Sequence, residues 1–228
     1  VNPNSEQAFV GYARENLLEI ALNDPKRNYV DPFGKPEIIY AVKPFWLMYG
    51  FRPLNEIKAN LAILIPRFFM EHDLAHADLK TLFKLLLGLT GEAKRLVLDK
   101  VRQNLPKLNN ATVNCWITKL SGEYSDDIGV IMPALLNLVY LEAGQALYVA
   151  PRIVNCFLQG VALSLSGNSR NLLRCALTKD HMDVDEFSVV TAFENTTPAL
   201  IEPGTVSAVE TAYKHMDMNF GLSVINMP

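Results

Sequence analysis

The sequence contains little cysteine, no long apolar run and almost no excess of either charge. Its three cysteines, Cys115, Cys156 and Cys175, form no CxxC pair, so they provide no disulfide framework and favour a reducing, cytoplasmic location. The apolar run 61–65 is far too short to span a bilayer, so we expect no membrane segment. Lys and Arg total 21 against 24 Asp and Glu, and this balance argues against a broad electrostatic nucleic-acid binder.

The chain also lacks the short motifs of several large enzyme classes. It has no nucleophile elbow, no P-loop and no dinucleotide fingerprint. Gly160 and Gly167 lie within strand-like alternation and do not form a phosphate-binding loop. Apolar neighbours flank Cys156 and Cys175, which predicts inert core thiols and not nucleophiles. With 228 residues, half of them hydrophobic, the sequence is that of a globular protein with one large or two small domains.

The first stretch, to about residue 57, predicts one helix and one strand. Ser5 is a candidate helix cap, and the turn sequence 23–25 should end the helix. The apolar run 38–42 is short and rich in β-branched residues, which indicates a buried strand. The expected helix has apolar residues at roughly helical spacing: Phe9, Tyr12, Ala13, Leu17 and Ile20.

The stretch 55–124 reads as helical throughout. Thr90 is a candidate cap, and Pro66 and Pro106 should interrupt or end helices. Two apolar stripes predict core packing: Leu79, Leu82, Phe83, Leu86 and Leu87, and then Leu96, Val97, Val101 and Leu105.

From about residue 129 the hydrophobic period changes to two. The segments 135–140, 145–149 and 161–166 predict antiparallel strands with one wet face. Strands, then helices, then strands again indicate an α+β chain whose β part is interrupted by a helical insertion.

His72 and His76 have the i, i+4 spacing of a zinc-binding helix. Asp73 stands where the HExxH motif needs a glutamate, and its side chain is one carbon shorter. No third ligand is evident nearby, so a solvated helix segment or turn is the favoured interpretation.

Several motifs occur in order along the chain and together suggest a family. The first third contains Asn28-Tyr29-x-Asp31-Pro32-x-x-Lys35-Pro36-Glu37 and then Gly50-Phe51-Arg52-Pro53. The last third contains Leu141-Glu142-Ala143-Gly144-Gln145-Ala146-Leu147, Phe157-Leu158-Gln159-Gly160 and Asn168-Ser169-Arg170-Asn171-Leu172-Leu173-Arg174-x-x-Leu177-Thr178. In this pattern the chain resembles the type I mannose-6-phosphate isomerase family over nearly its whole length.

This resemblance implies a cupin-type antiparallel β framework with an inserted helical domain. The implied boundaries are 1–56 for the first part of the core, 57–126 for the insertion and 127–228 for a truncated return to the core. The family interconverts mannose 6-phosphate and fructose 6-phosphate with zinc, so the implied cofactor is zinc and the implied ligand is a sugar phosphate. The family also has strands before and after the matched part, so we expect the chain to be incomplete and to leave open sheet edges for self-association or a partner chain.

The family binds zinc with one Gln, two His and one Glu, and only the Glu is retained here, as Glu37. Asn2 stands at the first histidine position and Asn155 at the second, while the Gln would precede Val1. An amide oxygen is a neutral and much weaker zinc donor than an imidazole nitrogen, so we expect most of the zinc affinity to be lost.

Two positively charged residues match family positions at the reaction site. Arg174 matches an arginine suited to a phosphate or a developing enediolate oxygen, and Lys35 matches a lysine beside the metal-binding Glu. Two departures also lie at the site, because Arg170 replaces an acid and Ser164 replaces a glutamate. Three hypotheses follow: a working isomerase, an inactive pseudo-isomerase that binds a sugar phosphate, and an interaction protein.

Overall fold

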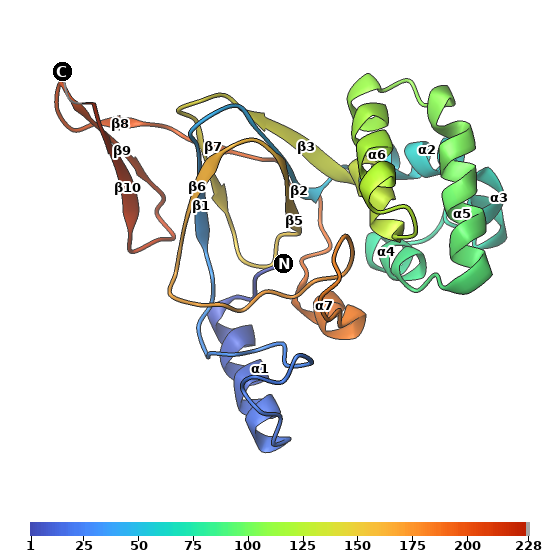
Figure 1. The fold of residues 1–228 in the computed structure, drawn as a ribbon, viewed down its shortest axis with the longest axis horizontal. Helices are drawn as coiled ribbons and strands as arrows, with labels where there is room; N and C mark the ends of the chain where they lie inside the picture. The colour runs from blue at the N-terminus through green and yellow to red at the C-terminus, as the bar shows by residue number, and fades with distance from the viewer. Residues whose placement is uncertain (227–228) are drawn as a thin grey trace. The chain divides into compact units, whose positions relative to one another are not determined.

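The computed structural model describes residues 1–226, and the chain divides into two compact units (Figure 1). The first unit consists of residues 1–49, 139–172 and the segment from Pro198 onward. The second unit consists of residues 50–138 and 173–197. Each unit is therefore assembled from segments that are far apart in the sequence.

The first unit contains one helix and two antiparallel sheets. A four-stranded sheet has the order β6-β1-β4-β7, and a three-stranded sheet has the order β10-β9-β8. The elements of this unit are α1 (Ser5–Leu17), β1 (Glu37–Ala41), β4 (Ala146–Val149), β5 (Asn155–Gln159), β6 (Ala162–Ser166), β7 (Leu200–Ile201), β8 (Gly204–Thr205), β9 (Glu210–Lys214) and β10 (Gly221–Ile225).

A third sheet has the order β3-β2-β5. The chain passes from the first unit into the second within β2 (Phe45–Phe51). It returns to the first unit within β3 (Leu136–Leu141). β2 pairs antiparallel with β5, with Tyr49 opposite Asn155. The expected antiparallel sheets are thus confirmed.

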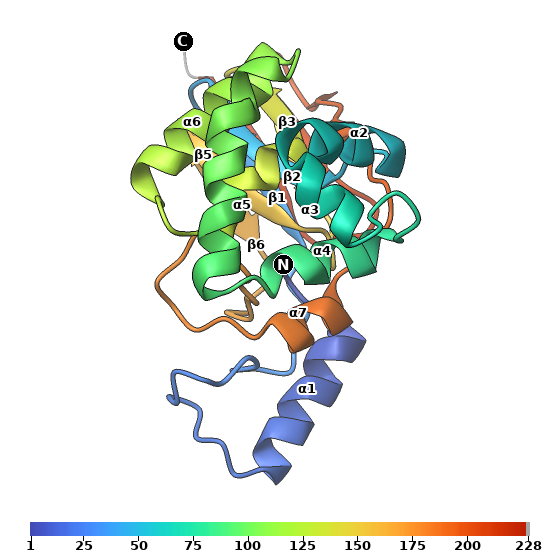
Figure 2. The ribbon, with the colours of Figure 1, turned by 90° about the vertical axis from the view of Figure 1, so that its right-hand side faces the viewer.

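The second unit is largely helical, as the sequence predicts (Figure 2). The stripe from Leu79 to Leu87 is buried, which confirms it as core. Leu96 of the second stripe is 58% exposed, whereas Val97 and Val101 are buried. The elements are α2 (Leu54–Leu64), α3 (Pro66–Glu71), α4 (Leu79–Leu87), α5 (Gly91–Asn104), the 3-10 turn η1 (Leu105–Lys107), α6 (Ala111–Glu123), the 3-10 turn η2 (Ile128–Ala134) and α7 (Val184–Val190).

Helix ends depart from the sequence expectation at two caps. Asn4, not Ser5, caps α1: its side-chain oxygen accepts from the Gln7 amide at 2.8 Å, and the Gln7 side chain accepts from the Asn4 amide at 3.1 Å. Thr90 occupies the cap position of α5 but makes no side-chain capping hydrogen bond. Asn4 is the cap because the reciprocal capping box also needs a suitable side chain three residues later, and Gln7 stands at that position.

The buried face of α1 is built from small and polar residues. Gly11 lies against the ring of Tyr29, where a Cβ atom would come within 2.3 Å of a ring carbon, so only glycine allows this approach. Glu15 is buried, and its carboxylate accepts hydrogen bonds from the amides of Asn28 and Tyr29 at 3.0 and 2.9 Å. The loop after α1 is therefore fixed along this face of the helix (Figure 1).

Asn171 holds the next part of the same loop. Its side chain is fully buried, and its oxygen accepts from the amide of Val30 at 2.9 Å. Its amide nitrogen donates to the carbonyl oxygens of Asp31 at 2.8 Å and Phe33 at 3.1 Å. One side chain thus fixes the loop that leads into β1.

Within residues 1–226, no helix is both long and apolar enough to cross a membrane.

We expect Asn171→Ala to lower the free energy of unfolding by about 3 kcal/mol, because several buried backbone groups lose their partner at once. Urea denaturation of both proteins measures this difference. Asn168→Ala, at an exposed position of the same loop, is the matched control and should change stability by less than about 0.5 kcal/mol. Equal effects of the two substitutions would contradict the role of Asn171.

The cysteines should differ in reactivity. Burial raises the pKa of the Cys156 thiol, whereas Cys115 is exposed. Because the thiolate is the reactive form, iodoacetamide at neutral pH should modify Cys115 at least about tenfold faster than Cys156. Mass spectrometry of peptides from a labelling time course measures both rates, and the denatured chain, in which the rates should converge, is the control. Equal rates in the folded protein would contradict the burial of Cys156.

Candidate functional site

Glu37 lies at the start of β1, the strand that has β4 on one side and β6 on the other. Its side chain is buried, with 7% of the residue exposed. The register places Glu37 opposite Val149 of β4 and Ser166 of β6. A carboxylate in this position needs hydrogen-bond donors or a cation, because burial of an unpaired charge is costly.

Asn2 supplies the first of these donors. Its amide nitrogen donates to Glu37 Oε2 at 3.2 Å and to the backbone oxygen of Lys35 at 3.0 Å. Asn2 is 2% exposed, and its backbone oxygen accepts from the amide of Arg152 at 2.7 Å. The side chain is therefore fixed between the backbone before β1 and the carboxylate.

Ser164 of β6 supplies the second donor. Its hydroxyl donates to Glu37 Oε1 at 2.5 Å, so each oxygen of the carboxylate has its own partner. Nothing in the sequence pattern predicts this bond, because Ser164 lies opposite Ile39 in the register and reaches Glu37 diagonally. We call Asn2, Glu37 and Ser164 the Glu37 cluster.

Lys35 and Asn155 lie in the same unit as the cluster. Lys35 is half-buried, and its backbone amide donates to the Pro3 oxygen at 3.2 Å. Asn155 begins β5, and its amide donates to the Ile153 backbone oxygen at 3.1 Å. Among the residues that the structure describes, no hydrogen bond joins Asn155 to Glu37. The structure thus joins Asn2 to Glu37 and leaves Asn155 with a local partner.

Arg174 belongs to the second unit. Its Nε atom lies 3.3 Å from Asp180 Oδ2, and both side chains are more than a third exposed. An exposed pair of this kind contributes little to stability, so its guanidinium can exchange Asp180 for another anion at small cost. Arg174 is therefore available as an anion-binding group.

The donor set around Glu37 does not fit zinc. It consists of one carboxylate, one hydroxyl and one amide whose nitrogen faces the carboxylate, and it contains no imidazole. In residues 1–226, no group of three or more His, Cys, Asp or Glu side chains could hold a metal ion. The hydrogen bonds from Asn2 and Ser164 meet the need of the buried carboxylate instead.

The histidines of the second unit do not form a metal site either. His72 ends α3, and its ring lies against that of Phe68, with 4.2 Å between centroids. His76 follows in a turn, and its Nδ1 lies 2.7 Å from Asp73 Oδ1. The interpretation of 72–76 as a solvated turn is thus favoured over a zinc helix.

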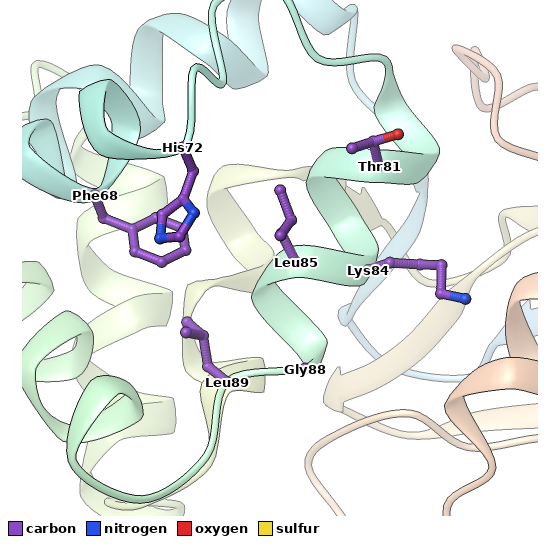
Figure 3. Close-up of a pocket in the computed structure, with 7 residues that line it drawn as sticks. All are labelled: Phe68, His72, Thr81, Lys84, Leu85, Gly88 and Leu89. Atoms are coloured by element: carbon purple, nitrogen blue, oxygen red, sulfur yellow. The ribbon is translucent and has the colours of Figure 1, made fainter.

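A shallow pocket of about 500 Å³ adjoins His72 (Figure 3). Its lining is mostly apolar, with Phe68 and His72 on one side and Leu85 and Leu89 on the other. Lys84 at its border pairs with Asp185 at 2.9 Å. Its polar lining residues have partners of their own: His72 lies against Phe68, Thr81 pairs with Asp78 and Lys84 pairs with Asp185, so the pocket does not define a reaction site.

No protein-family model matches the chain. Among curated proteins, the mannose-6-phosphate isomerase of Salmonella typhimurium is 34% identical over 203 residues, which cover 85% of this chain and 50% of that protein. The Escherichia coli mannose-6-phosphate isomerase is also 34% identical, and a probable mannose-6-phosphate isomerase of Dictyostelium discoideum is 27% identical over 82% of this chain. The chain spans about half the length of the curated relatives it matches.

Solved structures agree in fold. A zinc-bound mannose 6-phosphate isomerase matches with a TM-score of 0.87 and 33% identity over 98% of this chain and 58% of that chain. The Salmonella typhimurium enzyme bound to its substrate (f6p) and zinc matches with a TM-score of 0.88 and 32% identity, with the same coverage. Motifs, fold and relatives all agree, and this chain belongs to the mannose-6-phosphate isomerase family.

Proposed function

We propose that this chain binds a sugar phosphate in the manner of its family but does not carry out zinc-dependent isomerisation. The observation that carries the proposal is the pairing of both Glu37 oxygens with protein donors, at 3.2 Å from Asn2 and 2.5 Å from Ser164. The Glu37 carboxylate therefore has an amide nitrogen and a hydroxyl as neighbours, in place of the imidazole nitrogens that bind zinc well.

The reaction of the family also defines what is missing. Isomerisation moves a proton between adjacent carbons of the sugar, and negative charge develops on the oxygens while it moves. Zinc, when bound, supplies a Lewis acid for those oxygens. With Asn2 and Asn155 in the histidine positions, this chain has no matching group to stabilise that charge at Glu37.

Recognition of the phosphate depends on different groups. The fork-shaped guanidinium of Arg174 suits a phosphate, because it can donate two parallel hydrogen bonds. Lys35 adds an ammonium on a flexible stem, next to the cluster through its backbone. The resemblance assigns both residues to the substrate site, so binding can persist where catalysis does not.

Turnover and zinc binding test the catalytic half of this proposal. We expect no conversion of mannose 6-phosphate to fructose 6-phosphate by the purified chain, even in excess zinc. The Asn2→His, Asn155→His double variant should bind zinc at least about tenfold more tightly in a chelator competition, since imidazole is the better donor. Turnover by the unmodified chain would overturn the proposal.

Sugar-phosphate binding tests the other half. Fructose 6-phosphate should raise the melting temperature of the chain, because a ligand that binds only the folded state stabilises it. Arg174→Ala should weaken this binding at least about tenfold, the scale of one lost charge-assisted contact. Arg67→Ala, at an exposed arginine of α3, is the matched control and should leave it unchanged. A sugar phosphate that never shifts the melting temperature would contradict retained recognition.

The Glu37 cluster makes a separate prediction about pH. Ser164→Glu should place a second carboxylate against Glu37, and the like charges should raise the pKa of the pair above the usual range. The folded state then disfavours the charged form, so the destabilisation should be small at pH near 4 and grow to about 2 kcal/mol at pH near 8. Urea denaturation at both pH values measures it.

Ser164→Gln is the neutral control of the same size. Its effect on stability should not depend on pH over this range. A pH-independent effect of Ser164→Glu would show that the two carboxylates do not meet, and would contradict the geometry of the cluster.

A further inference from the structure

A polar crevice of about 370 Å³ lies between helix α5 and the end of helix α6, both in the second unit (Figure 2). One wall belongs to α5, where a spacing of three or four residues puts the lining side chains on one face: Arg95, Leu98, Asp99 and Arg102. The other wall consists of Ser121, in the last turn of α6, and of Ser125 and Asp126, which follow it. We call this space the α5–α6 crevice.

Two polar contacts hold the walls of the crevice together. Lys94 of α5 reaches across, and its Nζ lies 2.9 Å from Asp126 Oδ2. Arg102 donates to Asp99 Oδ1 at 2.9 Å on its own helix and to the backbone oxygen of Ser125 on the other side. The crevice is therefore formed before any ligand enters, which lowers the cost of binding.

Three hydrogen-bond donors of the lining have no acceptor. Within residues 1–226, the guanidinium of Arg95 and the hydroxyls of Ser121 and Ser125 form no hydrogen bond. The Ser121 hydroxyl is also buried, at the floor of the crevice. A buried hydroxyl without a partner is costly, so an acceptor in the crevice would remove an existing penalty.

The charge of the crevice is positive. Both carboxylates are already paired, Asp126 with Lys94 and Asp99 with Arg102, so Arg95 is the cation left over. The hydrogen bond from Lys94, together with the charges of Lys94, Arg95 and Arg102, lowers the pKa of the Asp126 carboxyl. The same field favours an anionic group of a ligand in the crevice.

We propose that the α5–α6 crevice binds a small phosphorylated polyol, with the phosphate on Arg95 and the hydroxyl groups of the ligand on the serines and carboxylates of the walls. Charged donors and phosphate oxygens form strong hydrogen bonds, and a guanidinium fork matches two of those oxygens. The proposed function does not use these residues, so this is a second site.

The size and lining of the crevice argue for more than a phosphate ion. Its volume falls in the range of pockets that hold small organic molecules. Leu98 is the apolar member of the lining and is buried, whereas the remaining lining residues are polar or charged. A body with hydroxyl groups fits these walls, because carboxylates accept from hydroxyls and serine hydroxyls both donate and accept.

A titration followed by amide nitrogen–proton NMR tests the site, with glycerol 3-phosphate as the probe at constant ionic strength. We expect the signals of residues 95–102 and 121–126 to shift, with a dissociation constant in the low millimolar range, about 1 to 5 mM. Glycerol, which lacks the phosphate, should cause no shift there. Inorganic phosphate, which lacks the carbon chain, should bind at least about threefold more weakly.

Two variants separate a ligand contact from a structural role. Arg95→Gln should weaken binding at least about tenfold and keep the melting temperature, because this exposed side chain has no hydrogen bond to lose. Ser121→Ala should weaken binding at least about threefold without lowering the melting temperature of the free chain, since the hydroxyl it removes has no partner. Arg67→Gln, at an exposed arginine of α3, is the matched control and should leave binding unchanged.

Several results would overturn the proposal. One is the absence of any shift at residues 95–102 and 121–126 up to about 50 mM probe. Shifts confined to the residues around Arg174 or Glu37 would place the probe at the proposed sugar-phosphate site alone and would leave the crevice empty. An affinity that Arg95→Gln does not change would remove the phosphate contact, and equal affinities for inorganic phosphate and glycerol 3-phosphate would remove the contacts to the polyol.

Discussion

A buried carboxylate must be paired, and the region around β1 is organised by this requirement. Glu37 begins β1, an inner strand of its sheet, and is 7% exposed. Asn2 and Ser164 pair with it from the N-terminal segment and from β6, so three separate parts of the chain are held at one point.

In the proposed function, Asn2 has two opposite effects. It replaces a histidine ligand of the family, and its amide is a hydrogen-bond donor to the buried carboxylate of Glu37. An alanine at residue 2 or 164 would leave a carboxylate oxygen without its donor, whereas asparagine and serine do not. The proposed loss of catalysis is therefore compatible with retention of the fold, because the side chains of residues 2 and 164 are polar.

Much of the fold could be predicted from the sequence, because the spacing of hydrophobic residues and the turn residues indicate helices and strands from short segments alone. The strand after Glu37, the helices of 55–124 and the alternation near Leu163 all appear where the pattern places them. The caps were less predictable, since Asn4 and Ser5 are both good capping residues and only the reciprocal bond with Gln7 decides between them.

The site was predictable only in part. The family resemblance indicated Glu37, Asn2 and Asn155 as one site, and the structure joins the first two by a hydrogen bond and gives Asn155 a local partner. It could not indicate Ser164 as a partner of Glu37, because a diagonal contact between strands depends on register. Nor could spacing reveal that α1 turns its small face inward, since Gly11 is explained only by the ring of Tyr29, eighteen residues further on.

The segmented make-up of the two units has a consequence for synthesis on the ribosome. The second unit needs residues 173–197 as well as 50–138, and the first unit needs strands that follow Pro198. All residues of the helical unit are therefore synthesised before the last strands of the sheets around β1. Asn2 and Glu37 leave the ribosome well before Ser164. The carboxylate of Glu37 must therefore stay hydrated in the nascent chain until the hydroxyl of Ser164 can donate to it.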